Sequence, residues 1–436
     1  MSVAAVSPDE AKQLTTTLTP VGAERAGNAQ GSIPKWTGGL DKSAGTPNPI
    51  NGALSDPFEA EKPLFVIDSQ NVGNYADKLS PGQMAMFKRY PDTYRLRVFP
   101  THRTAALPDK IYEVVSRNAV NTRLVTGGNG LENFDTAIPF PIPKSGLEVV
   151  WNHITRYRGG SYRRTYVQAT PLADGVFVPV YFTQQLTFRD HMKNFDPNNP
   201  GNILFYYKQL ITAPARLAGD VVLVHEPLDQ VKEPRSAWIY SAGQRRVRRA
   251  PQIAYDGPYP ASEGQRTGDN LDMYNGAPDR YDWTLVGKKE VYIPYNNYML
   301  ESPTLTYSDI VKPGHINSDL LRYELHRVWV VEANLKPGER HIFSKRVMYI
   351  DEDTWQIVLA DQYDSRNTLW RVAEGYMTQR YDQQIPWLGQ EAIYDLSNGR
   401  YIISGMRNEE KKPIEFNFFS SAADYTPTAL RNDGVR

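Results

Sequence analysis

From about residue 147 onward, apolar and polar residues alternate along the chain, which is the period of a half-buried β-strand. In the clearest segment, 178–189, the even positions are apolar except Gln184. Comparable runs occupy 202–211, 220–225, 237–240, 283–286, 290–295, 323–333, 342–350, 355–361, 369–379, 392–396 and 400–404. Short turns such as Ser397-Asn398-Gly399 separate several of them. Strands joined in this way pair antiparallel, because a parallel neighbour needs a long crossover.

The pattern therefore predicts a mainly β (α+β) protein built on one large curved antiparallel sheet of roughly ten or more strands. A curled sheet with one apolar face is a half-barrel that encloses a cavity, and a few helices can cover it. Two capping boxes indicate helix starts, at Ser7-Pro8-Asp9-Glu10 and at Ser80-Pro81-Gly82-Gln83.

The first 75 residues differ from the rest. After the first short helix, 21–63 is rich in Gly, Pro, Asn and Ser and has no sustained period. We predict an extended N-terminal arm over 1–75 and a single curved-sheet domain over 76–436. Inside that domain, the segment 255–281 contains seven glycine and proline residues and no period. Such a long loop is either a lid or binding loop, or a surface loop with no role.

Composition narrows the functional classes. The 49 Lys and Arg balance the 49 Asp and Glu, so no nucleic-acid partner is expected. With no cysteine, disulfides, thiol nucleophiles and Cys-based zinc sites are excluded. The apolar runs are far shorter than the ~18 residues of a membrane-spanning helix. The opening residues Val3-Ala4-Ala5 fit a chain whose signal peptide has been removed.

Enzyme signatures fail on inspection. His225-Glu226 begins like a zinc-protease motif, but Pro227 follows and the second histidine is missing. We therefore assign no catalytic residue, metal or cofactor. His326 is expected to be a hydrogen-bonded structural histidine, and the carboxylates of 351–353 are expected to be solvated in a hairpin turn. A pair of carboxylates across a cleft, as a glycosidase needs, stays open.

Aromatic rings provide broad contact area for lipid-like ligands. The candidates for lining a cavity are Trp151, Phe182, Trp238, Tyr240, Trp283, Trp329 and Trp355, although most rings on such strands belong to an ordinary core.

One run of positive charge also stands out. Arg245, Arg246, Arg248 and Arg249 are split by strand alternation between two faces, so we expect at least one pair to point into a polar region or to be ion-paired. The alternatives are docking of an anionic headgroup or partner protein, or nucleic-acid binding, which the neutral net charge disfavours.

Several segments resemble a large uncharacterised bacterial family that is described as outer-membrane lipoprotein-sorting-like. They are 237–240, 243–251, 279–283, 292–296, 322–329, 349–355 and 369–372, together with Ile33-Pro34-Lys35-Trp36-Thr37-Gly38-Gly39 in the arm. The resemblance implies a Lol-like fold, a half-barrel closed by helices around an apolar cavity. It also implies secretion to the periplasm of Gram-negative bacteria, association with resistance–nodulation–division-type exporters or other envelope proteins, and no established catalytic residues.

Together these observations predict a periplasmic carrier or binding protein for a lipid or other hydrophobic molecule. The protein would shield its ligand without catalysis and contact membranes transiently. Two alternatives remain: an envelope scaffold that docks a transporter, and a glycan or lipid hydrolase.

Overall fold

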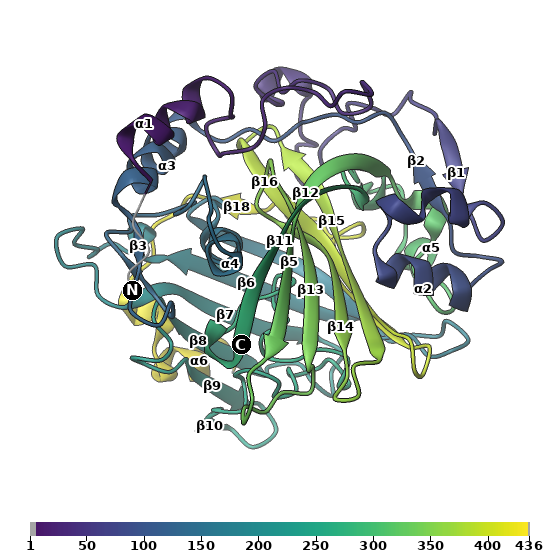
Figure 1. Cartoon of the computed structure of the whole chain (residues 1–436). Coiled ribbons are helices and arrows are strands. Elements are labelled where there is room, and N and C mark those ends of the chain that lie inside the picture. The colour runs from purple at the N-terminus through teal and green to yellow at the C-terminus, as the bar shows by residue number, and fades with distance from the viewer. Residues whose placement is uncertain (1–5, 435–436) are drawn as a thin grey trace.

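One sheet dominates the protein (Figure 1). The computed structural model describes residues 6–434. The strands of that part of the chain are β1 (Phe65–Ile67), β2 (Leu96–Val98), β3 (Arg123–Leu124), β4 (Leu131–Glu132), β5 (Ser161–Ala169), β6 (Val180–Phe188), β7 (Ile203–Ala213), β8 (Val221–Pro227), β9 (Ser236–Ser241), β10 (Arg246–Arg249), β11 (Tyr281–Pro294), β12 (Tyr323–Leu335), β13 (Lys345–Asp351), β14 (Ile357–Tyr363), β15 (Leu369–Arg380), β16 (Ile385–Asp395), β17 (Tyr401–Met406) and β18 (Glu415–Phe416). The helices are α1 (Pro8–Ala11), α2 (Pro81–Arg89), α3 (Asp109–Asn121), α4 (Gly146–Thr155), α5 (Tyr307–Ile310) and α6 (Pro427–Gly434).

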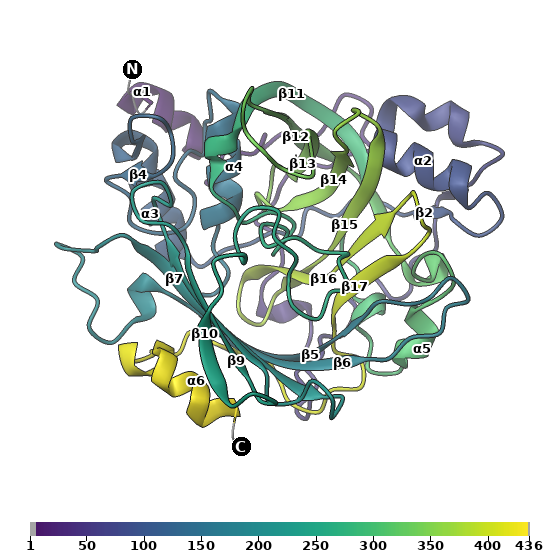
Figure 2. The same cartoon turned by 90° about the horizontal axis from the view of Figure 1, so that it is seen from below.

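Sixteen of the strands form a strongly curved, unclosed sheet (Figure 2). Its main path runs β1-β2-β12-β13-β14-β15-β16-β17-β5-β6-β7-β8-β9-β10, and off this path β11 pairs with β12 and β18 with β5. All of these pairs except β2–β12 are antiparallel. The sheet is mixed only where β2 meets β12 in parallel, at Tyr323 opposite Val98. The predicted fold class, a mainly β protein on one large curved antiparallel sheet, is confirmed.

Strand β11 is one continuous strand, although the alternating pattern predicts two separate strands there, at 283–286 and 290–295. The register shifts between Leu285 and Gly287, and Gly287 has a φ of 129°, which side-chain-bearing residues rarely adopt. This bulge bends the strand without ending it, so β11 stays paired with β12 over its whole length.

Helices cover the convex face at two places. The predicted capping box forms at α2, where the Ser80 hydroxyl accepts the Gln83 N–H and the Gln83 side chain accepts the Ser80 N–H. Helix α2 packs on β14 and β15, and α6 packs on β8, β9 and β10. No helix of the described residues is long and apolar enough to cross a membrane.

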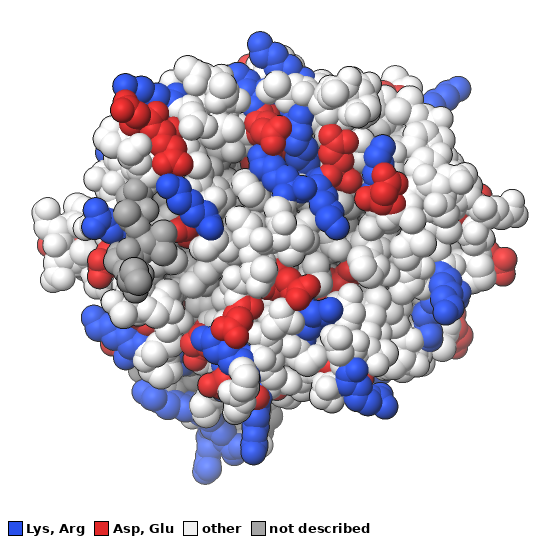
Figure 3. All heavy atoms as spheres, in the orientation of Figure 1, with Lys and Arg blue, Asp and Glu red and all other residues white. Residues whose placement is uncertain are grey.

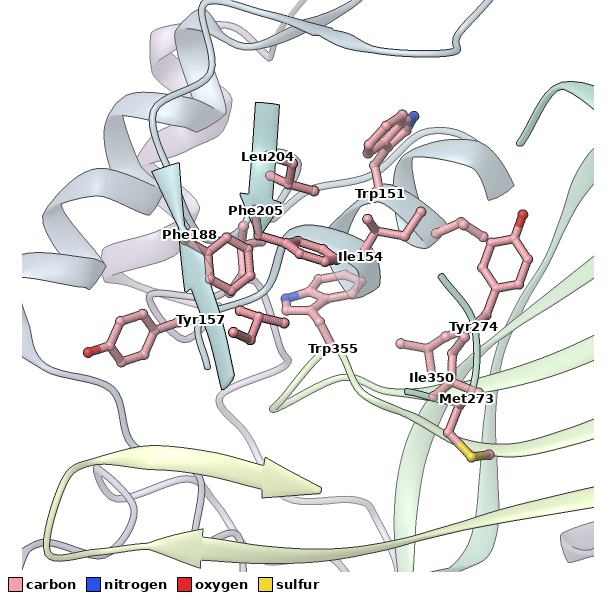
Figure 4. Close-up of a cluster of buried hydrophobic side chains, with 14 of the residues drawn as sticks. Trp151, Ile154, Tyr157, Phe188, Leu204, Phe205, Met273, Tyr274, Ile350 and Trp355 are labelled. Atoms are coloured by element: carbon pink, nitrogen blue, oxygen red, sulfur yellow. The ribbon is translucent and has the colours of Figure 1, made fainter. Parts of the chain in front are cut away.

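The concave face is filled by α4 and by the 255–281 loop (Figure 2). The prediction of strand from residue 147 is wrong for α4. There Leu147, Val150, Trp151 and Ile154 recur at the helical spacing i, i+3, i+4 and i+7. Figure 4 shows Trp355 of the β13–β14 turn among Ile154 of α4 and Phe188 and Phe205 of the facing strands. The hollow predicted as an apolar cavity is thus occupied by the protein's own side chains.

Polar contacts fix the loop in this hollow. His153 of α4 donates from Nε2 to the carbonyls of Asp272 and Tyr274, and its Nδ1 accepts the Ile357 N–H. Burial and Arg156 lower the pKa of His153 to about 3, in keeping with a neutral ring. The Asp272 carboxylate accepts from Arg156 and Arg158, both at 2.6 Å. Burial opposes ionisation of this carboxyl, but the two guanidinium groups hold its pKa below the ordinary value. The loop is part of the core, and its role as a lid stays a prediction.

The arm lies over the rim of the sheet. Its carbonyl at Val21 accepts the indole N–H of Trp355 at 2.9 Å, and β1 at its end pairs with β2. The division into an arm over 1–75 and a domain over 76–436 stays a prediction.

We expect Asp272→Asn to destabilise the protein by about 3 kcal/mol, because it leaves two buried guanidinium groups without their shared carboxylate. Urea unfolding measures the free energy, and hydrogen exchange should show faster exchange confined to the 255–281 loop. The control is Asp282→Asn, an exposed carboxyl on β11. Equal free energies of unfolding for the two variants would contradict the conclusion that Asp272 fixes the 255–281 loop in place.

Candidate ligand-binding pocket

The clearest pocket for a small molecule lies beneath the N-terminal arm. Its volume is about 640 Å³, within the range of small-molecule sites. Residues 46–61 form its roof, and we call this space the arm pocket. Its floor comes from the end of β2, the segment 296–305 after β11, and residues 320–322 before β12. The apolar lining side chains are Leu54, Phe58, Phe99, Met299, Leu305, Leu320 and Leu321.

The roof is tied down by side chains. All hydrogen bonds between backbone groups of 46–61 and other backbone groups of the described residues stay inside the segment, with the N–H groups of Asn48, Gly52, Glu59 and Glu61 as donors. The Tyr381 hydroxyl donates to the Ser55 carbonyl at 3.0 Å, and Arg380 donates to the Gly52 carbonyl at 3.0 Å. The roof can therefore lift without breaking a strand pairing.

Charged groups gather at one end of the arm pocket. Glu61 accepts from Arg322 and lies 2.7 Å from His102 Nε2. The Arg322 guanidinium stacks over Phe58 and Phe99, with its central carbon 5.0 Å and 4.6 Å from the ring centroids. Burial raises the pKa of Asp56. An apolar pocket with a polar end suits a ligand that has an apolar body and a polar terminus.

Two other spaces fit a hydrophobic ligand less well. The space left on the concave face is about 40 Å³, room for a few waters, and its walls include Arg156, Arg158, Arg164 and Arg266. A hollow of about 770 Å³ between loops 125–135, 189–202 and 228–232 is more open to solvent.

The seven aromatic candidates do not share one site. Trp151 and Trp355 are buried in the central core, against which Trp283 and Trp329 pack. Phe182 stacks on Tyr166 in a separate cluster. Trp238 and Tyr240 lie under α6 on the convex face. None of the seven lines the arm pocket, and their contact with a ligand stays a prediction.

The four arginines of 245–249 are all exposed, in the edge strand β10 or directly before it. Among the described residues none of them makes an ion pair. Lys and Arg side chains project from this lower edge of the molecule (Figure 3). The ion pairing expected for one pair is therefore not seen among the described residues, and the expectation that a pair points into a polar region stays a prediction. Arg249 instead lies over the Trp238 ring at 5.6 Å. Charge along a sheet edge blocks pairing with other chains, and docking of an anionic group here stays a prediction.

Sequence reasoning missed the arm pocket because its roof has no period. The one available signal was the set of large apolar side chains Ile50, Leu54 and Phe58, each four residues after the last. The floor residues come from segments far apart in the chain, and no local pattern brings them together.

Comparison with known proteins places the chain among relatives without an assigned activity. The model of a family described as protein of unknown function (DUF1329) matches residues 66–431. An uncharacterized protein of Pseudomonas aeruginosa is 63% identical over 434 residues, covering 100% of this chain and 95% of that protein.

Two solved structures are also similar. A DUF1329 family protein from Desulfovibrio piger is 16% identical with a TM-score of 0.43, covering 63% of this chain and 92% of the other. A LolA superfamily protein from Nitrosomonas europaea is 11% identical with a TM-score of 0.39, covering 65% and 98%.

We expect Tyr381→Phe to loosen the roof of the arm pocket, because the variant loses the hydroxyl that binds Ser55. Hydrogen exchange and limited proteolysis should speed up within 46–61, while the free energy of unfolding changes by about 1 kcal/mol or less. Tyr363→Phe, on a strand outside the pocket, is the control. Unchanged exchange of 46–61 in Tyr381→Phe would show that the roof is held by other contacts.

Proposed function

The chain belongs to the DUF1329 family of proteins of unknown function, and we propose that it binds and shields a hydrophobic molecule in the cell envelope without catalysing a reaction. The family resemblance inferred from the sequence is thereby confirmed. The observation that carries the proposal is the arm pocket, a space of about 640 Å³ with apolar and polar walls under a roof without strand pairings.

The proposal puts the ligand at the rim of the sheet. The concave face, where the sequence suggested the cavity, is occupied by α4 and the 255–281 loop. The arm pocket combines an apolar wall with a roof that can open, and a carrier needs both in order to load and release its ligand.

Burial of apolar ligand surface supplies enough free energy for binding. Each methylene moved from water into an apolar pocket contributes about 0.8 kcal/mol, so a dozen contribute about 10 kcal/mol. After the cost of association this corresponds to roughly micromolar affinity. Half-buried Leu54 and Leu305 face such a chain, while Arg322 and Glu61 offer partners to a polar terminus.

The periplasm and a partner among exporters or other envelope proteins are proposed on the sequence resemblance. The exposed arginine edge of β10 favours a second function, a platform that docks an acidic envelope protein. The two functions differ in whether the purified protein carries a hydrophobic ligand.

The proposal is tested by ligand content and by one substitution. Native mass spectrometry and solvent extraction of the purified protein should show a co-purified hydrophobic molecule. Leu305→Glu puts a charge into the apolar wall, and we expect it to weaken binding of the fluorescent probe N-phenyl-1-naphthylamine about tenfold, or about 1.4 kcal/mol.

The matched control is Val286→Glu, an equally polar change at a valine on β11 that is 53% exposed. It should bind the probe like the wild type. A clean protein whose probe binding is unaffected by Leu305→Glu would overturn the carrier proposal and leave the docking platform or a hydrolase.

A further inference from the structure

The carboxylates of the β13–β14 turn are buried, although the sequence suggested a solvated hairpin. The exposed fractions of Asp351, Glu352 and Asp353 are 0%, 2% and 4%. The arm covers the turn, and the Glu352 carboxylate accepts the backbone N–H of Glu24 at 3.2 Å. Burying three consecutive carboxylates is costly unless cations compensate them.

Counting charges over this cluster leaves an excess of negative charge. The cluster consists of two groups of ion pairs, and His326 joins them because it lies between Glu324 and Asp351. It contains six carboxylates and four cations. The carboxylates are those of Glu24, Glu61, Glu324, Asp351, Glu352 and Asp353, and the cations are Arg103, Lys288, Arg322 and Arg327. With every carboxylate ionised and no charge assigned to His326, the formal charge is 4 − 6 = −2. A single divalent cation would neutralise it.

Three potential metal ligands meet inside this cluster. One ligand atom each from His326, Asp351 and Asp353 lies within 4.8 Å of the others, and His326 Nδ1 is 3.9 Å from Asp351 Oδ1. Adjacent strands bring them together, because Asp351 ends β13 opposite Val328 of β12. Ligand atoms around a cation at about 2.1 Å lie about 3.4 Å apart, a spacing that small side-chain rotations reach.

A second observation points to a missing ligand. Asp351 Oδ2 accepts from the Thr354 N–H and hydroxyl, but Asp351 Oδ1 and the Tyr295 hydroxyl have no hydrogen-bond partner among the described residues. Asp351 is 0% exposed and Tyr295 2%, so both groups are shielded from bulk water. The Tyr295 ring also lies against His326, with centroids 4.0 Å apart.

The histidine is oriented as in protein metal sites. Its Nε2 lies 3.0 Å from the Glu324 carboxylate, which can only accept, so the hydrogen sits on Nε2. In a ring that carries this hydrogen alone, the lone pair of Nδ1 faces Asp351. A carboxylate that holds the far nitrogen of a metal-binding histidine is the usual arrangement in such sites.

We propose that His326, Asp351 and Asp353 bind one divalent first-row transition-metal cation, such as Zn²⁺ or Mn²⁺. One imidazole and two carboxylates suit these ions better than Ca²⁺ or Mg²⁺, which prefer all-oxygen sites. Asp353 already accepts two hydrogen bonds from Arg103, at 2.8 and 2.6 Å, and keeps lone pairs for a metal. Since the site is buried, the ion is structural: it ties the turn to β12 and, through Glu352 and Glu24, to the arm.

The test uses the full chain. Metal content is measured by mass spectrometry after purification, and again after unfolding in EDTA and refolding with Zn²⁺ or Mn²⁺. We expect one cation per chain and a melting temperature several degrees above that of protein refolded without metal. Asp351→Asn should lose both effects.

The matched control is Asp361→Asn, a buried carboxyl on β14 that accepts from Ser80 outside the cluster, and it should keep both effects. Equal metal content in the two variants, or a wild type that holds no cation and does not respond to either metal, would overturn the proposal and leave protons as the compensating charge. If Asp351→Asn does not fold, the wild type decides through a cobalt-substituted form, whose visible absorption reports a nitrogen and oxygen ligand set. No such band would equally overturn it.

Discussion

A curved sheet of this size presents a broad apolar surface on its concave side, and leaving that surface against water would forfeit most of the free energy that holds the fold together. In this protein, elements of the same chain cover that apolar surface. Helix α4 and the loop before β11 enter the hollow, and His153 and Asp272 satisfy the polar groups that this insertion buries. The position of the ligand pocket depends on this filling of the concave face.

Because the hollow is filled, room for a ligand exists only where the packing ends. At the rim, the arm spans the ends of β2 and the loops after β11. Its roof segment is held by Tyr381 and Arg380 and, at its end, by the contacts of Glu61 with Arg322 and His102. The ionic cluster beneath the neighbouring part of the arm is much more tightly bonded. The arm is thus bonded into the ionic cluster at Glu24 and Glu61, and the part of the roof before Glu61 is held by Tyr381 and Arg380.

The sequence predicted what depends on local period and missed what depends on distant neighbours. Alternation located most strands, and the box at Ser80 located α2. Helix α4 carried a readable signal, since Leu147, Val150, Trp151 and Ile154 follow the helical spacing, but the strand rhythm beyond it obscured the boundary. The burial of Asp353 could not be predicted, because it depends on Arg103, which lies 250 residues earlier in the chain. The arm pocket could not be predicted either, because segments that are far apart in the chain form its walls.

The arm's contacts also set the order in which the molecule can be completed. Val21 binds Trp355 across 334 residues, and Gly52 binds Arg380 across 328. Closing such long loops is entropically unfavourable until the strands at the far end are in place. The contacts of Val21 and Gly52 can therefore form only after the C-terminal strands have paired. The arm reaches its final position only when the C-terminal strands have folded, so an incompletely folded chain has no complete pocket for a ligand.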